Sequence, residues 1–263
     1  MDCSATEEEM VSLPSWETMY HDKKFSWFWP PAYDPHSSPP EIETVISLLG
    51  LRPGARLLDL ACGQGWLTIP LAQRGFRVTG LDLSATLLAR AEQAADQAGV
   101  GAEWVRGDMR DLPGEWTARF DCVSLTLSEF GCFDDESDNQ RVLDEVARVL
   151  KAEGRFLLDV VVNRDGLVLQ GESRGYLEGD GFFVSDEGTL DLLSGIYQRV
   201  FHWFYEGQRH EAQWQIRAYT PPEVARMLDK AGLRVSAVYG NLMGDRLTRE
   251  SMGMAFIAQK RTV

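Results

Sequence analysis

Residues 56–82 read RLLDLACGQGWLTIPLAQRGFRVTGLD and predict a strand, a glycine turn, a helix and a second strand. The first strand is a short apolar run, which is typical of a strand buried on both faces. Gly63 and Gly65 interrupt this run, and glycine permits positive φ and close approach of another group to the backbone. The helix is expected over residues 66–74, and the second strand follows it and ends at Asp82.

Asp82 stands about 20 residues after the glycine turn, where nucleoside-binding βαβ units place an acid for ribose hydroxyls. Two details argue against a nicotinamide dinucleotide. Thr68 replaces the third glycine of G-x-G-x-x-G, so close approach of helix and strand around a pyrophosphate is not provided for. Asp59 lies just before the turn, where a carboxylate repels a pyrophosphate but suits an ammonium group or a sulfonium centre.

Strands and helices alternate through most of the remaining chain. Further strands are expected over residues 103–106, 120–127, 154–162, 233–239 and 253–259. Helices are expected over residues 41–49, 85–97, 138–150 and 221–230. This alternation predicts an α/β fold with a doubly wound, mostly parallel seven-stranded sheet that carries helices on both faces.

The pattern changes in residues 168–217, where no long helix is indicated. Short antiparallel strands are expected at 182–184, 196–204 and 211–217, with a hairpin turn around Gly207. We interpret this segment as an inserted β lid that caps the substrate. The core of the fold is then expected in residues 41–167 and 218–263.

Residues 1–40 form a separate N-terminal segment that is rich in proline and aromatic residues. Prolines between residues 30 and 40 exclude a continuous helix there. Trp29 and Tyr33 belong to a dense group of aromatic side chains in the same region. Two interpretations remain open: ordinary packing at the edge of the domain, or an arm that covers the cofactor or the substrate.

The chain has 263 residues, of which 44% are hydrophobic, so it can form one large α/β domain or a domain with an inserted cap. Its net charge of −14 disfavours nucleic acid as a partner, because phosphate binding needs clustered Lys and Arg. Neither a signal peptide nor an apolar stretch of membrane-spanning length is indicated. The four cysteines lack zinc spacing, so we expect reduced thiols, a cytoplasmic location and no metal.

The D-x-x-x-G-x-G arrangement at residues 59–65 resembles motif I of the class I S-adenosylmethionine-dependent methyltransferases. In this resemblance Asp82 matches the family's ribose-binding acid, and GDMRDLP at 107–113 is similar to the segment that contacts adenine. Asp108 would accept a hydrogen bond from the adenine amino group, and Met109 would cover the ring. The resemblance implies S-adenosylmethionine as cofactor, bound by Asp59, Ala61, Gly63, Gly65, Asp82, Leu83, Asp108, Met109, Leu125 and Tyr33.

SEFGCF at 128–133 resembles the loop after the fourth strand in a bacterial small-molecule branch of this family. That branch also shows the pattern R-x-Y-T after its β lid, which is found here at 217–220. The resemblance implies a small-molecule methyl acceptor and S-adenosylhomocysteine as product. The residues expected to bind the acceptor are Ser128, Phe130, Arg217, Tyr219 and Trp29.

A catalytic base is needed only if the accepting amine or hydroxyl is protonated at rest. Glu129 and Tyr219 are the candidate catalytic residues, although a solvated or helix-capping acid is an equally open interpretation of Glu129. His202 and His210 are less favoured, because they lie in strand-like stretches at solvent-facing positions. Arg217 would either clamp a substrate carboxylate or form a structural ion pair.

Three functions are compatible with these features. The favoured one is methyl transfer to N or O of a small molecule by in-line displacement. A nicotinamide-dependent oxidoreductase predicts a third glycine and a Tyr/Lys or His pair after the fourth strand, and neither is found in the sequence. A non-catalytic S-adenosylmethionine-binding protein predicts loss of Asp82 or of the glycines, and all are retained. The acceptor and the oligomeric state are left open.

Overall fold

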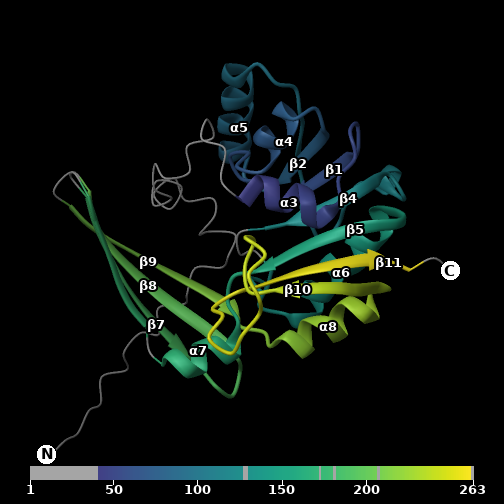
Figure 1. The fold of residues 1–263 in the computed structure, drawn as a ribbon. Helices are drawn as coiled ribbons and strands as arrows, with labels where there is room; N and C mark the ends of the chain where they lie inside the picture. The colour runs from purple at the N-terminus through teal and green to yellow at the C-terminus, as the bar shows by residue number, and fades with distance from the viewer. Residues whose placement is uncertain (1–40, 127–129, 172, 180–181, 206–207, 262–263) are drawn as a thin grey trace, which may run out of the picture.

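The computed structural model describes residues 41–126, 130–171, 173–179, 182–205 and 208–261. Within these residues the chain forms one sheet of seven strands and a second sheet of four strands (Figure 1). The larger sheet carries the helices, and the smaller sheet stands beside it.

The main sheet has the strand order β10-β11-β5-β4-β1-β2-β3. Its strands are β1 (Arg56–Leu60), β2 (Arg77–Asp82), β3 (Glu103–Arg106), β4 (Phe120–Leu125), β5 (Leu150–Val160), β10 (Leu233–Tyr239) and β11 (Met254–Lys260). Strand β1 pairs in parallel with β2 and β4, and β11 runs antiparallel to both of its neighbours, β5 and β10. The predicted seven-stranded, mostly parallel sheet is confirmed.

Helices cover both faces of this sheet. They are α3 (Glu41–Leu49), α4 (Thr68–Gln73), α5 (Ala85–Ala98), α6 (Glu136–Val149) and α8 (Pro221–Lys230), with a 3-10 turn at Gly114–Trp116. Leu58 of β1 packs in the cluster that contains α6 and α8, whereas Leu57 packs in the cluster that contains α3 and α4. The sheet is therefore doubly wound, as predicted. In the described part of the chain, no helix is both long and apolar enough to span a membrane.

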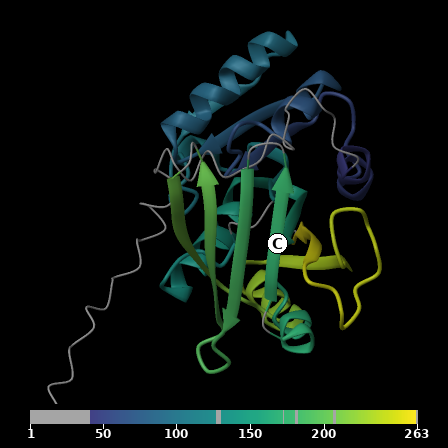
Figure 2. The same ribbon diagram turned by 90° about the vertical axis from the view of Figure 1, so that its left-hand side faces the viewer.

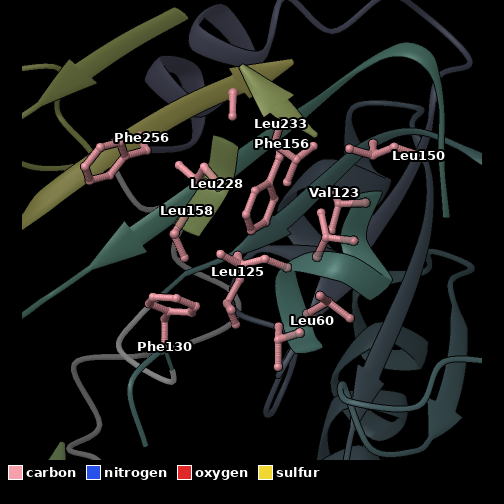
Figure 3. Packing of buried hydrophobic residues seen from close by; sticks show 14 of the residues in the cluster. Leu60, Val123, Leu125, Phe130, Leu150, Phe156, Leu158, Leu228, Leu233 and Phe256 are labelled. Atoms are coloured by element: carbon pink, nitrogen blue, oxygen red, sulfur yellow. The ribbon is translucent and has the colours of Figure 1, made fainter. Parts of the chain in front are cut away.

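The larger core lies between the main sheet and α6 and α8. Figure 3 shows Val123 and Leu125 of β4 beside Phe156 and Leu158 of β5, and all four side chains are fully buried. Burial of side chains of this size stabilises a fold by about 1.5–3 kcal/mol each. Phe130 extends the same cluster beyond the carboxyl end of β4, so the loop after β4 is anchored to the core.

Helices α5 and α8 begin and end close to the predicted positions, with the expected caps. The Ser84 hydroxyl accepts a hydrogen bond from the Leu87 N–H at 3.3 Å, and Gly99 closes α5 with φ of 66°. At α8 the Glu223 carboxylate accepts from the Thr220 N–H at 2.8 Å, which is half of a capping box. These ends follow from local side-chain chemistry.

Three other boundaries differ from the prediction. Helix α4 begins later, because the Gly65 N–H donates to the Cys62 carbonyl at 2.9 Å in a preceding turn. Helix α6 begins earlier, because the Asp135 carboxylate caps it by accepting from the Ser137 N–H at 2.8 Å. Strand β5 also begins earlier, at Leu150, since it follows α6 without an intervening loop.

The second sheet is antiparallel and has the order β6-β7-β8-β9 (Figure 2). Its strands are β6 (Ser173–Gly179), β7 (Phe182–Leu190), β8 (Ile196–Tyr205) and β9 (Gln208–Arg217). The predicted antiparallel strands are found, but they are longer than expected, and β6 was not predicted. Pairing of β8 with β9 continues to Tyr205 and Gln208, whereas the predicted turn residue Gly207 lies outside the described residues.

Helix α7 (Arg164–Gln170) leads from β5 toward the second sheet and was not predicted. The Asn163 side chain caps it by accepting from the Asp165 N–H at 3.2 Å. Gly166 lowers the helix propensity of this short segment, which explains why the sequence pattern does not reveal it. A Cβ at Gly166 would clash with the Ser251 carbonyl, so glycine is required by packing here.

Candidate active site

The glycine turn follows β1 at the carboxyl edge of the main sheet. Ala61, Gly63 and Gly65 all have positive φ, at 52°, 54° and 87°. A Cβ on Gly65 would lie 2.9 Å from Ile69 and 3.0 Å from Trp104, so packing requires this glycine. Within the part of the chain that the structure describes, a Cβ on Gly63 would meet nothing within 4 Å. Gly63 is therefore the point at which a ligand can approach the turn.

Asp82, at the end of β2, lies with its carboxylate against this turn. It accepts hydrogen bonds from the Gly63 N–H and the Ser84 N–H, both at 2.8 Å. The structure thus brings together the acid and the glycine that the sequence predicts for one nucleoside site.

Asp59 is buried between α4 and β4. The Thr68 hydroxyl donates to its carboxylate at 2.7 Å, and the Ser124 hydroxyl donates at 3.1 Å. Burial raises the pKa of Asp59 to about 6, and the nearby Asp82 carboxylate adds to this shift. Both oxygens of Asp59 are used within the protein, so its side chain supports the turn. Thr68, which stands where dinucleotide-binding proteins have a third glycine, is part of that support.

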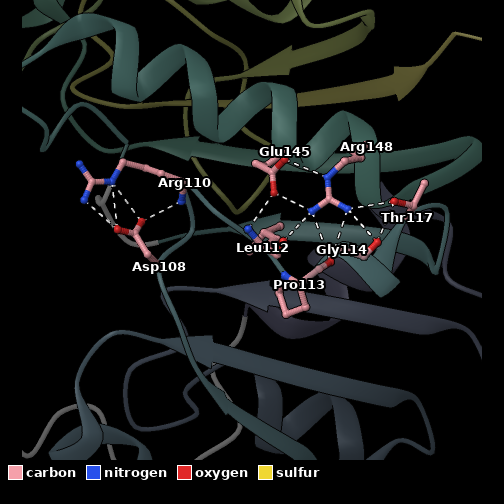
Figure 4. Close-up of polar contacts among 8 residues, drawn as sticks. All are labelled: Asp108, Arg110, Leu112, Pro113, Gly114, Thr117, Glu145 and Arg148. Atoms are coloured by element: carbon pink, nitrogen blue, oxygen red, sulfur yellow. Dashed lines mark hydrogen bonds and ion pairs between the residues drawn. The ribbon is translucent and has the colours of Figure 1, made fainter.

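Asp108 follows β3 and is held by Arg110 (Figure 4). Partial burial alone would raise its pKa, but hydrogen bonds from the Arg110 guanidinium and N–H keep the pKa of this carboxyl below its ordinary value. Arg110 also pairs with Asp138 at 2.6 Å and lies 4.5 Å over the Phe133 ring. Met109 is half-buried against the core. Asp108 is therefore ionised and fixed in orientation at the strand end.

The segment after Asp108 is tied to α6 by a second arginine (Figure 4). Arg148 donates to the Leu112 carbonyl at 2.8 Å and to the Thr117 hydroxyl at 3.0 Å. The Leu112 N–H donates to Glu145 at 2.7 Å, and Glu145 pairs with Arg148 at 2.6 Å. Two arginine contacts thus fix the loop after β3 on the rest of the fold.

Leu83 and Leu125 occupy two further strand ends that the sequence predicts for cofactor binding. Leu83 is half-buried, and its carbonyl accepts from Arg106 at 3.2 Å. Leu125 is fully buried in the main core. Leu125 therefore packs behind the site in this structure, while its predicted contact with the cofactor stays a prediction.

Phe130 and Tyr219 meet beyond the end of β4, with ring centroids 5.4 Å apart and both side chains buried. The loop that leads from Phe130 to α6 is fixed at Gly131, whose N–H donates to the Asn139 side chain at 3.0 Å. The Gly131 carbonyl accepts from the Arg217 N–H at 2.9 Å. Three of the predicted acceptor-binding residues, Phe130, Arg217 and Tyr219, are thus brought together.

The polar side-chain atoms of Arg217 and Tyr219 differ in their hydrogen bonding. The Arg217 Nη1 donates to the Ser194 carbonyl at 2.8 Å. Its Nε and the Tyr219 hydroxyl are buried and have no hydrogen-bond partner among the described residues. Burial, with a smaller contribution from Glu136, raises the pKa of Tyr219 well above its ordinary value. The Tyr219 hydroxyl therefore stays protonated at neutral pH and acts as a donor.

Other predicted residues are not part of this group. Trp29, Tyr33, Ser128 and Glu129 lie outside the described residues, so their roles stay predictions.

The two histidines that sequence reasoning considered lie on the four-stranded sheet. His202 Nδ1 is 3.3 Å from the Glu211 carboxylate and 3.2 Å from Arg209. The His210 ring stacks on Trp203 at 5.4 Å between centroids. Both rings are thus engaged within that sheet.

Sequence reasoning missed the parts played by Arg110, Ser124 and Asn139. Ser124 could have been found as a polar residue inside the apolar run at 120–127. The other two gave no local signal, because Arg110 meets Asp138 on α6 and Asn139 meets the backbone of Gly131 only in the folded chain.

The fold is shared with solved methyltransferases. The CcbJ methyltransferase of Streptomyces caelestis superposes with a TM-score of 0.79 at 21% identity, covering 94% of this chain and 99% of that one. CalS10 of Micromonospora echinaspora, an amino pentose methyltransferase solved with S-adenosylmethionine, superposes with a TM-score of 0.67 at 22% identity, covering 87% and 94%. At these identities the similarity establishes the fold.

Sequence comparison establishes the family. Residues 57–154 match a family described as a methyltransferase domain. The chain is 31% identical to YqeM of Bacillus subtilis, named as a methyltransferase, over 78% of this chain and 84% of that protein. It is 29% identical to the cypemycin N-terminal methyltransferase of a Streptomyces species, over 79% and 84%. The chain belongs to the class I S-adenosylmethionine-dependent methyltransferases. The oxidoreductase and non-catalytic alternatives are therefore not retained.

Proposed function

We propose that this enzyme transfers the methyl group of S-adenosylmethionine to a nitrogen or oxygen atom of a small molecule by in-line displacement. The observation that carries the proposal is the open backbone at Gly63 beside the Asp82 carboxylate. Ligands of open parallel sheets bind at the carboxyl ends of the strands, where both residues lie. Phe130 and Tyr219 lie at the same edge, beyond β4.

The described residues fit the cofactor in four respects. The backbone at Gly63 can be approached, and Asp82 can accept hydrogen bonds from ribose hydroxyls. The ionised Asp108 can accept from an adenine amino group, and Met109 can cover the ring. Ala61 and Leu83 would contribute backbone at the turn and the strand end. When bound, S-adenosylmethionine supplies a methyl group on a sulfonium sulfur, which is a good leaving group.

The protein's own contribution is orientation in a dry site. Correct alignment of two reactants is worth about 7–11 kcal/mol of the barrier. Asp59 stiffens the turn through α4 and β4, and Arg110 fixes Asp108. The buried rings of Phe130 and Tyr219 exclude water, and an aromatic face beside a cationic methyl group stabilises it by about 0.5–2 kcal/mol.

An amine or hydroxyl acceptor is supported by the names of related proteins. The cypemycin enzyme is named for an N-terminal position and CalS10 for an amino pentose, and both are compatible with transfer to nitrogen. Glu129 remains our candidate base. Tyr219 acts in this proposal as a hydrogen-bond donor that orients the acceptor, because its raised pKa keeps its hydroxyl protonated.

We also propose that residues 168–217 form a lid over the acceptor, on a core of residues 41–167 and 218–263, with residues 1–40 as an arm over the pocket. In support, β5 runs toward the four-stranded sheet (Figure 1). Ser128 and Trp29 are proposed to contact the acceptor. We place the enzyme in the cytoplasm, on the ground that Cys62, Cys122 and Cys132 are buried and form no disulfide. The net charge of −14 supports a small-molecule acceptor over nucleic acid.

The test is calorimetric titration of the purified protein with S-adenosylmethionine and S-adenosylhomocysteine. We expect micromolar binding of both ligands, and a loss of at least tenfold in affinity in Asp82→Ala. Asp96→Ala, which removes an exposed acid from α5, is the matched control and should bind normally. Equal binding by the two variants would reject the proposed site.

A further inference from the structure

Two buried hydrogen-bond donors near the end of β4 have no partner within the described chain. They are the Arg217 Nε and the Tyr219 hydroxyl. Buried polar groups in native proteins are almost always hydrogen-bonded, because an unsatisfied one costs the folded state its desolvation energy. Only Ala218 separates the two residues in sequence, so one ligand bound at this place would satisfy both donors.

The two side chains belong to one short segment at the junction of the two sheets. Arg217 is the last residue of β9, and Ala218, which is fully buried, separates it from Tyr219. The Tyr219 ring packs on Phe130, and the Gly131 carbonyl accepts from the Arg217 N–H. The segment is therefore held against the loop that follows β4, beside the edge where the proposed methyl transfer takes place.

The chemistry of the two groups specifies an anionic acceptor of hydrogen bonds. Arg217 carries a permanent positive charge, and within the described residues it forms no ion pair, although the chain has a net charge of −14. Glu223, one of the acids that influence Tyr219, is already bound by Arg164 at 2.7 Å and by the Thr220 hydroxyl at 2.8 Å. Tyr219 is a neutral donor at physiological pH.

We infer that Arg217 Nε and the Tyr219 hydroxyl bind a carboxylate of the methyl acceptor, so that the acceptor is a small carboxylic acid that also bears the accepting nitrogen or oxygen. The inference rests on the proposed function and deepens it. A carboxylate has two oxygens, one for each of the two donors. The Arg217 Nη1 already donates to the Ser194 carbonyl. A phosphate would leave an oxygen without a donor from this pair.

The experiment measures methyl transfer from radiolabelled S-adenosylmethionine to matched acceptor pairs that differ only in the carboxylate. Suitable pairs are glycine and glycinamide, alanine and alaninamide, and tyrosine and tyrosinamide. We expect transfer to at least one acid, with kcat/KM at least tenfold lower for its amide. Arg217→Gln and Tyr219→Phe should each lower kcat/KM for the acid by about ten- to hundredfold. Affinity for S-adenosylhomocysteine should be unchanged in both variants, and the preference for the acid over its amide should fall about tenfold in each.

Arg209→Gln is the matched control, because Arg209 lies on the same strand at an exposed position. It should leave the preference for the acid unchanged. Tyr219→Phe should also unfold at a temperature no lower than the wild type, since it removes a hydroxyl that no described residue bonds. A lower unfolding temperature would instead make the hydroxyl structural and overturn the inference.

Equal transfer to acids and amides, or transfer to none of the acids, would also overturn the inference. Either result leaves the proposed function standing if S-adenosylhomocysteine binds and Asp82→Ala abolishes that binding. Absence of S-adenosylhomocysteine binding would count against the proposed function itself.

Discussion

The two acids and the two glycines at the glycine turn differ in their surroundings. Asp82 presents its carboxylate to the turn, whereas Asp59 is 2% exposed and bonded to Thr68 and Ser124. Gly63 has open space beside it among the described residues, whereas Gly65 is enclosed by side chains. Asp82 and Gly63 are the pair proposed to contact the cofactor, whereas Asp59 and Gly65 hold the turn in shape.

Asp59 should make stability depend on pH. Its pKa rises from 3.8 to about 6 on folding, so the folded state binds the proton more tightly, and this group destabilises the fold increasingly as pH rises from about 4 to about 6. A shift of this size corresponds to about 3 kcal/mol. Asp59→Asn removes the titration, so its free energy of unfolding relative to wild type should rise by about that amount between about pH 4 and about pH 7. Urea unfolding at both pH values measures the difference, and a constant difference would contradict the assignment.

The two glycines should respond oppositely to alanine. Gly65→Ala introduces a methyl group against Ile69 and Trp104 at a φ of 87°, so we expect a loss of about 1–3 kcal/mol in the free energy of unfolding. Gly63→Ala meets open space, so it should destabilise the fold less but weaken S-adenosylhomocysteine binding by at least tenfold. Thermal unfolding and calorimetry on the two variants distinguish these effects. Equal effects on binding would show that Gly63 does not face the cofactor.

At the level of elements, α6 organises the carboxyl edge of the sheet. Its Asp138 forms an ion pair with Arg110, and its Arg148 donates a hydrogen bond to the Leu112 carbonyl. Its Asn139 side chain accepts a hydrogen bond from the Gly131 N–H. The loops after β3 and β4, which are proposed to contact cofactor and acceptor, are thus both held in position by one helix.

Replacing the two arginines of Figure 4 should have different effects, one on the stability of the fold and the other on cofactor binding. Arg148→Ala leaves the Leu112 carbonyl without its charged donor, so we expect a loss of about 1.5–3 kcal/mol in the free energy of unfolding. Arg110→Ala releases Asp108, so S-adenosylhomocysteine should bind about tenfold more weakly. Each variant serves as the control for the other, measured by urea unfolding and calorimetry. The same loss of affinity in both would mean that the loop responds as a unit.

On the scale of the whole molecule, two sheets of different kinds meet at one edge. The main sheet is mostly parallel and buried on both faces, and the four-stranded sheet is an antiparallel meander joined to it through α7 and the segment after β9 (Figures 1 and 2). Arg217 and Tyr219 lie where that second connection enters the core.

Binding of S-adenosylhomocysteine should stabilise the main sheet selectively. At about 100 times its Kd, a ligand adds about 2.7 kcal/mol to the free energy of unfolding. Hydrogen exchange should slow around residues 59–68, 82–88 and 106–112, because those strand ends are proposed to contact the cofactor. The strands β7 to β9 should exchange at unchanged rates. Asp82→Ala is the control, and protection confined to the four-stranded sheet would refute the assignment.

Local patterns sufficed to predict the seven strands, the glycine turn and the caps of α5 and α8, because period, turn chemistry and capping operate within a few residues of the chain. They did not reveal α7, whose Gly166 weakens the helical pattern, nor β6. They placed Asp59 at the site but could not show that it is buried and bonded within the protein.

The βαβ order and its nucleoside chemistry were thus readable in residues 56–82 alone. Folding decided which side chains meet: Asp59 with Ser124 across 65 residues, Arg110 with Asp138 across 28, and the ring of Phe130 with that of Tyr219. Contacts between residues far apart in the chain follow from sheet order and packing, so the hydrophobic periodicity of the sequence does not predict them. For the same reason, only the folded chain shows that Arg217 Nε and the Tyr219 hydroxyl are buried without a partner among the described residues.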